Sequence, residues 1–182
     1  MVILGIDSGF KNTGVALMDT ATNYISTKTI KSDNYRLGEN DNKYTIMYSI
    51  AYDIIKFITF EKNAYEGIER MPAVVVAENS ISRFVGRHIS ELTETRAVIL
   101  AMVGHLVISR FNAKTVQINN MSIKKYFFGK DAEHPINSPT KKEMICLMQH
   151  RHKIEPAGDK KKEKTEHEYD AIALCDWYVS TH

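Results

Sequence analysis

The chain has 182 residues and a mass of 20.8 kDa, with 43% hydrophobic and 25% charged residues. These values predict a single globular domain over residues 1–182 and exclude a disordered or fibrous chain. The longest clean apolar run, Ala97–Val103, is far shorter than the roughly 20 residues of a membrane span, and Asp7 interrupts the first apolar stretch too early for a signal peptide.

The formal net charge of +2 is unevenly distributed. Residues 141–164 hold eight Lys or Arg and four acids, so this segment carries +4 and the rest of the chain −2. A basic segment on a mildly acidic body indicates a polyanionic partner, and a solvated lysine-rich loop would give the same pattern. Cys146 and Cys175 lack a close partner spacing, so we expect reduced, buried thiols in helices of a cytoplasmic protein.

The first thirty residues predict three strands. Val2–Ser8 alternates between two faces, and Thr13–Met18 and Tyr24–Lys31 continue with residues typical of strands. Because the connections between these segments are short, we expect an antiparallel meander.

Two helices and two further strands follow. Isoleucines recur every four positions over residues 46–58, which predicts an amphipathic helix. Ala73–Ala77 is apolar throughout, as in a strand buried on both faces, and it ends at Glu78. Ser90–Arg110 predicts a second long helix, and Lys114–Ile118 a fifth strand.

The last third of the chain predicts three helices. Met121–Phe128 is expected to end at Gly129, and capping-box spacings at Thr140–Glu143 and Thr165–Glu168 mark the starts of the other two. The order βββαβαβααα indicates an α/β fold, a mixed five-stranded sheet with helices on its faces.

Three acids lie where apolar elements end or begin. Asp7 is near the end of the first strand, Glu78 closes the fourth, and Asp170 lies in the first turns of the last helix. An acid at the end of a buried strand costs solvation free energy unless an opposite charge pairs with it. Mg²⁺ or Mn²⁺ can supply that charge, because both ions prefer carboxylate ligands. Each acid alone is also compatible with a turn or capping role.

Three motifs carry a resemblance to a known family. GIDSGFKNTGVAL, AVVVAEN and HEYDAIALC, in this order, resemble the RuvC family of Holliday junction resolvases. The resemblance implies an RNase H-like fold, with three antiparallel strands and then two parallel ones. It also implies a homodimeric endonuclease of DNA recombination and repair, bacterial or phage-encoded, that cuts four-way junctions and leaves 5′-phosphates. Two Mg²⁺ ions per site are implied, for which Mn²⁺ can substitute, and the face of Ser90–Arg110 is a candidate dimer contact.

The resemblance also assigns the metal ligands. It implies that Asp7, Glu78 and Asp170 bind the ions and that His167, three residues before the final acid, is a fourth ligand. Glu166 remains an alternative because it lies on the same helical face as Asp170. We expect Glu168 to be turned away by the capping box.

Further residues are implied to contact the DNA. Lys124 and either Lys141 or Lys142 match lysines near the scissile phosphate, and we take Lys142 as catalytic and Lys141 as DNA-binding. The remaining candidates are a wedge at the junction and a basic loop before the last helix: Ile81, Arg83, Phe84, Lys160, Lys161, Lys162 and Lys164.

Other functions begin with similar motifs. The sugar kinase, actin and heat-shock ATPase superfamily also opens with GID-x-G, but it needs two such domains and this chain supplies one. A non-catalytic binder is disfavoured because all three acids are present. The principal alternative is a related nuclease acting on RNA–DNA hybrids or other branched DNA, since substrate choice depends on the surface around the site.

Overall fold

The computed structural model describes residues 1–35, 42–64, 72–79, 87–133, 135–137, 139–154 and 164–182. Side chains are not described at residues 60–64, 87–91 and 106–111, which lie in helices. No helix in these ranges combines the length and the apolar character that crossing a membrane requires.

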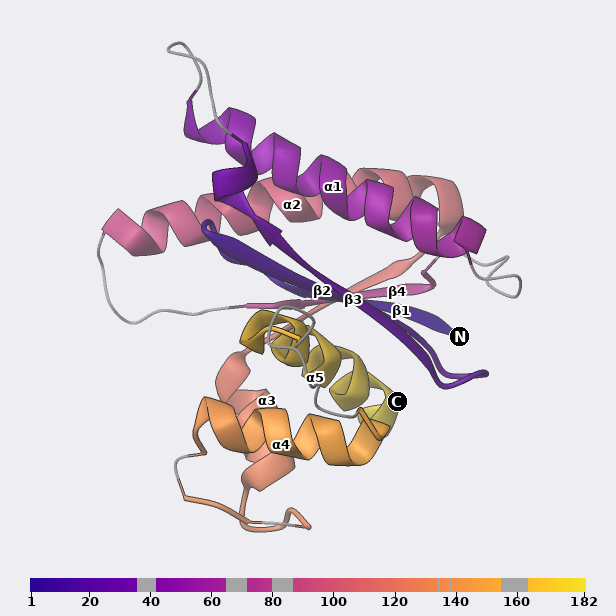
Figure 1. The fold of residues 1–182 in the computed structure, drawn as a ribbon, viewed down its shortest axis with the longest axis vertical. Helices are drawn as coiled ribbons and strands as arrows, with labels where there is room; N and C mark the ends of the chain where they lie inside the picture. Colours follow the sequence, from indigo (N-terminus) through magenta and orange to yellow (C-terminus); the bar gives the residue numbers. More distant parts are fainter. Residues whose placement is uncertain (36–41, 65–71, 80–86, 134, 138, 155–163) are drawn as a thin grey trace.

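A five-stranded mixed sheet forms the centre of the molecule (Figure 1). Its strands lie in the order β3-β2-β1-β4-β5. The first three strands form the antiparallel meander, and β4 and β5 join in parallel to β1 and to β4, respectively. The bounds are β1 (Val2–Asp7), β2 (Asn12–Asp19), β3 (Tyr24–Lys31), β4 (Val74–Glu78) and β5 (Lys114–Ile118). The predicted sheet is confirmed, including the change from antiparallel to parallel pairing.

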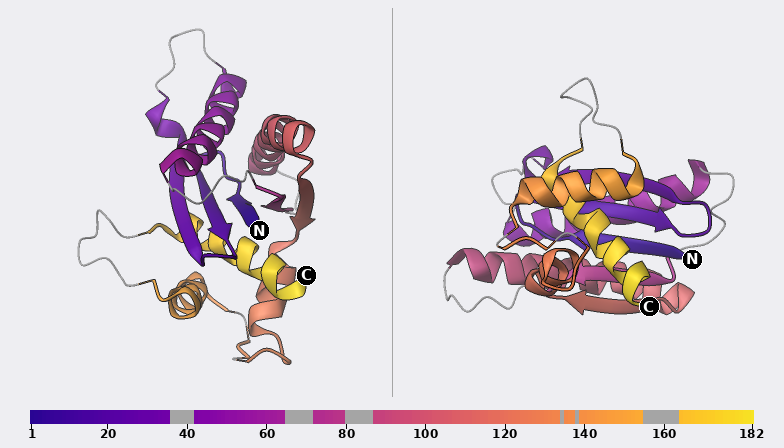
Figure 2. Two further views of the ribbon diagram at one scale, coloured as in Figure 1. Left: turned by 90° about the vertical axis from the view of Figure 1, so that its right-hand side faces the viewer. Right: turned by 90° about the horizontal axis from the view of Figure 1, so that it is seen from below.

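Helices cover both faces of this sheet (Figures 1 and 2). α1 (Lys43–Ala64) and α2 (Arg87–Phe111) pack on one face, where the isoleucines of α1 and the apolar side chains of β1 and β2 share a buried core. α3 (Asn120–Phe128), α4 (Lys141–His152) and α5 (Glu166–Thr181) cover the other face around a second core. A short 3₁₀ helix (Ser32–Asn34) follows β3. All five predicted helices are present.

α5 lies directly against the backbone of β1 and β2, and two glycines allow this approach. A Cβ on Gly14 would lie 1.9 Å from the His167 carbonyl oxygen, and one on Gly5 would lie 2.2 Å from that of Ala171. Because Gly14 is paired with Asp7 in the β1–β2 ladder, the same contact brings the first turn of α5 over the end of β1. The two glycines therefore set where α5 crosses the sheet.

The two predicted capping boxes differ in outcome. Thr140 and Glu143 form a complete box at the start of α4, as predicted. At α5, Thr165 accepts a hydrogen bond from the Glu168 backbone N–H, but the Glu168 carboxylate accepts from the hydroxyls of Thr27, at 2.6 Å, and Thr29, at 2.9 Å. The predicted return of Glu168 toward Thr165 is therefore wrong, because two threonines on β3 compete for its carboxylate. Through these two hydrogen bonds, Glu168 links α5 to β3.

The two cysteines are free and helical, as expected, but only one is buried. Cys175 lies in the second core, whereas Cys146 is exposed on α4. The prediction of two buried thiols is wrong for Cys146, because α4 packs through Met144 and Met148 and turns Cys146 toward solvent.

Candidate active site

The three predicted acids meet at one end of the sheet. Asp7 and Glu78 are the last residues of β1 and β4, which are parallel neighbours, so both carboxylates leave the sheet at the same edge. Asp170, in the second turn of α5, completes the group, and all three side chains line one small cavity together with Asn120 from α3. We refer to Asp7, Glu78 and Asp170 as the acidic cluster.

Burial and the charge of Asp7 raise the pKa of the other two members of this cluster. Burial, followed by the charge and the hydrogen bond of Asp7, raises the pKa of Glu78 to about 7. Burial and the charge of Asp7 likewise raise the pKa of Asp170 to about 6. Two carboxylates with raised pKa values beside a third acid are the expected environment of a cation-binding site.

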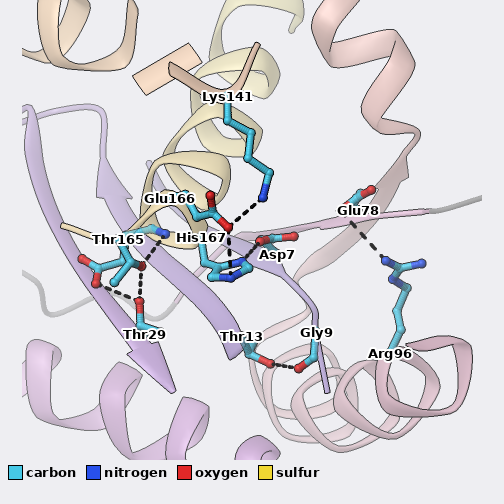
Figure 3. Close-up of polar contacts among 11 residues, drawn as sticks. Asp7, Gly9, Thr13, Thr29, Glu78, Arg96, Lys141, Thr165, Glu166 and His167 are labelled. Carbon is cyan, nitrogen blue, oxygen red and sulfur yellow. Dashed lines mark hydrogen bonds and ion pairs between the residues drawn. The ribbon is translucent and has the colours of Figure 1, made fainter. Parts of the chain in front are cut away.

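The cluster also has a donor set that suits a hard divalent cation. Asp7, Glu78 and Asp170 offer carboxylate oxygens, and His167 can add an imidazole nitrogen. Among the described residues, however, no three acidic, His or Cys side chains are gathered closely enough to hold a metal ion in this arrangement. Asp7 is instead directed toward His167, and Glu78 toward Arg96 (Figure 3).

His167 lies beside the cluster and contacts Asp7. Its Nδ1 is 2.9 Å from Oδ2 of Asp7, and its side chain is only 23% exposed. The hydrogen bond with Asp7 raises the pKa of His167, against the opposing effect of burial. The structure thus brings the predicted fourth residue to the predicted acids rather than leaving it on the surface.

Glu166 and Lys141 form an ion pair at the rim of the site (Figure 3). Lys141 Nζ donates to Oε1 of Glu166 at 2.7 Å, and the same oxygen lies 3.7 Å from His167 Nε2. The pKa of Lys141 is raised, first by this hydrogen bond and also by the charges of Asp170 and Asp7. The Lys141 ammonium therefore lies within the electrostatic reach of the acidic cluster.

The other predicted lysines lie in different places. Lys142 is exposed at the start of α4. Lys124 is half-buried on α3 and lines a groove of about 620 Å³ together with Lys125 and Phe128. Lys164 donates to the hydroxyl of Thr27 at 2.5 Å, so it is engaged within the protein.

Six predicted DNA contacts cannot be placed. They lie outside the described residues: Ile81, Arg83, Phe84, Lys160, Lys161 and Lys162.

Two polar residues of the site were not among the predicted ones. Asn120, the first residue of α3, hydrogen-bonds to the Glu78 carboxylate, and Arg96 of α2 reaches the same carboxylate at 4.0 Å. The sequence holds a signal for Arg96, because its charge interrupts the apolar face formed by Leu92, Ile99 and Val103. It holds none for Asn120, which resembles any polar residue at a helix start.

Comparisons with known proteins support the fold. No protein-family model matches the chain, and no curated protein sequence matches it. Among solved structures, Thermus thermophilus RuvC superposes with a TM-score of 0.62 at 14% identity, over 99% of this chain and 96% of that chain. The T. thermophilus RuvC complex with a Holliday junction substrate gives 0.60 at 15% identity, over 99% and 95%. The yeast mitochondrial Holliday junction resolvase gives 0.61 at 12% identity, over 97% and 77%. The chain thus has the fold of these resolvases, as its three motifs predict.

Proposed function

We propose that this chain is a metal-dependent endonuclease that resolves four-way DNA junctions. The observation that carries the proposal is the acidic cluster, in which carboxylates from β1, β4 and α5 line one cavity beside His167. Fold likeness to solved junction resolvases over nearly the whole chain supports the choice of substrate. A cytoplasmic location remains a prediction.

Asp7, Glu78, Asp170 and His167 would hold the divalent ions. Mg²⁺ is the expected metal, with two ions per site, because carboxylates suit hard cations and phosphodiester cleavage commonly uses a pair of them. When bound, such ions polarise the phosphate and activate water. The Asp7 carboxylate already lines the cavity, so binding of a cation would require only that its hydrogen bond with His167 be exchanged for a shared ion.

A lysine near the acidic cluster can bind the phosphate group of the substrate. The Lys141 ammonium lies near the cluster and can offset the charge that develops on the phosphate oxygens. We propose Lys141 rather than Lys142 for this role, supported by its hydrogen bond to Glu166 beside His167. Water attacks phosphorus and the bond to the 3′-oxygen breaks, which leaves a 3′-hydroxyl and a 5′-phosphate.

A homodimer explains how one site per chain cuts two strands. Two copies related by a two-fold axis present equivalent sites to a junction of similar symmetry. A face of α2 remains our candidate for the contact between copies. Paired, symmetric nicks near the branch follow from this arrangement.

A junction with a mobile core, labelled on each strand in turn, tests the proposal. We expect nicks at symmetric positions in two opposing strands, products that ligase seals directly, and dependence on Mg²⁺ or Mn²⁺. Linear duplex should bind far more weakly at moderate salt, because only the branched form reaches both subunits at once. D170N serves as the inactive control.

Two outcomes would redirect the assignment. Faster cleavage of an RNA–DNA hybrid or a flap would favour the related RNase H-like nuclease. Cuts that are asymmetric or cannot be ligated would contradict junction resolution.

A further inference from the structure

Arg96 approaches the acidic cluster from the opposite layer of the fold. It belongs to α2, which covers the face of the sheet away from α5, and Figure 3 shows its guanidinium directed at Glu78. Its side chain is only 7% exposed, and the next apolar positions along the same helical face, Ile99 and Val103, are fully buried. A buried guanidinium costs free energy unless a negative charge opposes it.

The acidic cluster supplies that negative charge. Nη2 of Arg96 lies 4.0 Å from Oε2 of Glu78, and the carboxylate of Asp7 also acts on Arg96. Glu78 in turn lies between this cation, the Asn120 side chain and the repelling charge of Asp7. Arg96 therefore attracts the Glu78 carboxylate, which the neighbouring Asp7 carboxylate repels.

The geometry of the pair leaves Glu78 able to bind something else. The ion-pair distance of 4.0 Å is longer than the hydrogen bonds of a bidentate arginine–carboxylate pair, in which two short bonds occupy both oxygens. Arg96 can thus attract the carboxylate without covering all of its lone pairs.

We propose that Arg96 is a positioning residue of the acidic cluster, which holds the Glu78 carboxylate in place and balances the cluster when no divalent cation is bound. The part of this inference that concerns cations rests on the proposed function. Arg96 itself touches neither substrate nor reacting atoms in this role, and it acts through Glu78.

A double-mutant cycle on the full chain tests the proposal. Thermal unfolding in EDTA is measured for the unmodified protein, R96M, E78Q and the double variant. We expect R96M to lower the melting temperature by about 5 °C, and by less than half as much in the E78Q background, because the larger of the two charges that act on Arg96 is then absent. Equal losses in both backgrounds would show that Arg96 does not act through Glu78 and would overturn the proposal.

Matched variants keep the test decisive. R151M removes an arginine that pairs with Asp176 at another place in the fold, so its effect should be the same with or without E78Q. R96K retains the positive charge and should restore more than half of the loss seen with R96M. If R96M does not fold, R96K is compared in the two backgrounds: a loss that shrinks with E78Q supports the proposal, and an equal loss overturns it.

A second arm with MnCl₂ separates this inference from the proposed function. We expect Mn²⁺ to raise the melting temperature of R96M more than that of the unmodified protein, because the added cation replaces the missing charge. If Mn²⁺ stabilises no variant, the proposed metal site is wrong, while the cycle in EDTA still decides the role of Arg96. If Mn²⁺ stabilises both proteins equally, the charge-balancing part of the proposal is overturned.

Discussion

The carboxylates of Asp7, Glu78 and Asp170 are expected to matter for chemistry, and those of Glu78 and Asp170 are also expected to destabilise the fold without metal. We predict that D7N, E78Q and D170N each reduce junction cleavage by at least about 100-fold and leave junction binding largely intact. Without metal, E78Q and D170N should stabilise the protein above pH 7, because each removes a carboxylate whose pKa is raised. Single-turnover cleavage, gel shift and thermal unfolding measure the three effects.

A remote acid provides the control for these variants. Asp53 lies on α1, on the other face of the sheet, where it accepts a hydrogen bond from Tyr35. D53N should cleave at the normal rate. Near-normal turnover in any of the three cluster variants would remove that residue from the ligand set.

His167 and Glu166 are neighbours with different expected roles. His167 contacts Asp7 directly, whereas Glu166 contacts Lys141 at the rim. We predict that H167A slows single-turnover cleavage more than E166A does, and that H167D retains substantial activity because a carboxylate can replace the imidazole as ligand. The opposite ranking would make Glu166 the ligand.

Lys141 and Lys142 form a matched pair, because they are adjacent, exposed lysines and Lys141 contacts Glu166 at the rim of the site. K141A should slow single-turnover cleavage by about 10- to 100-fold, since an ammonium near the phosphate is lost. K142A should change the rate by less than about threefold, because the contact with Glu166 at the rim of the site belongs to Lys141. Equal effects would mean that neither lysine is placed for catalysis.

At the scale of the elements, packing of α4 against α5 depends on a buried acid. Asp176 of α5 is paired with Arg151, at 2.7 Å, and His152, at 3.6 Å. Burial alone would raise the pKa of Asp176, but the hydrogen bonds and charges of these two partners outweigh it, so its pKa is lowered. A lowered carboxyl pKa stabilises the fold above the unfolded value of about 3.9 and loses that contribution as the pH falls through the folded value.

The Asp176 carboxylate should stabilise the fold at neutral pH more than in acid. D176N should lower the free energy of unfolding at pH 7 by about 1 to 3 kcal/mol and by progressively less below pH 4. Urea denaturation at pH 7 and pH 3 measures the difference. A constant loss at both values would mean that Asp176 contributes through packing rather than charge.

The elements themselves were largely predictable from the sequence, because their signals are local. Alternation over Val2–Ser8, the repeat over residues 46–58 and the apolar run before Glu78 each reflect burial that the structure retains. The capping box at Thr140 was predictable for the same reason. At Glu168 the local pattern was insufficient, because threonines about 140 residues away bind its carboxylate.

The three acids of the site were predictable from the sequence, but the residues that contact them from other elements were not. Asp7, Glu78 and Asp170 stand out because each interrupts or ends an apolar segment. Arg96 reaches them across the sheet, and Asn120 from a helix start. The sequence marks Arg96 as a charge on an apolar helical face, but the contact that either residue makes depends on tertiary structure.

At the scale of the whole molecule, the basic segment before α5 should govern affinity for DNA in general. We predict that replacing Lys160, Lys161 and Lys162 with Ala weakens binding to all DNA forms and flattens the slope of log affinity against log salt by roughly one unit per lost phosphate contact. K164A is the control, because its ammonium donates to Thr27 and should leave the slope unchanged. An unchanged slope in the triple variant would mean that these lysines are only solvated.

The hydrogen bond between Asp7 and His167 has a consequence for when the site forms during translation. It joins residues 160 positions apart, one from the first strand and one from the last helix. At about 5 to 20 residues per second, a ribosome needs roughly 8 to 32 s to add the intervening chain. Throughout that interval a nascent chain holds Asp7 and, later, Glu78, but not α5. Protein synthesis therefore delays any nicking activity until α5 has emerged and docked on the sheet.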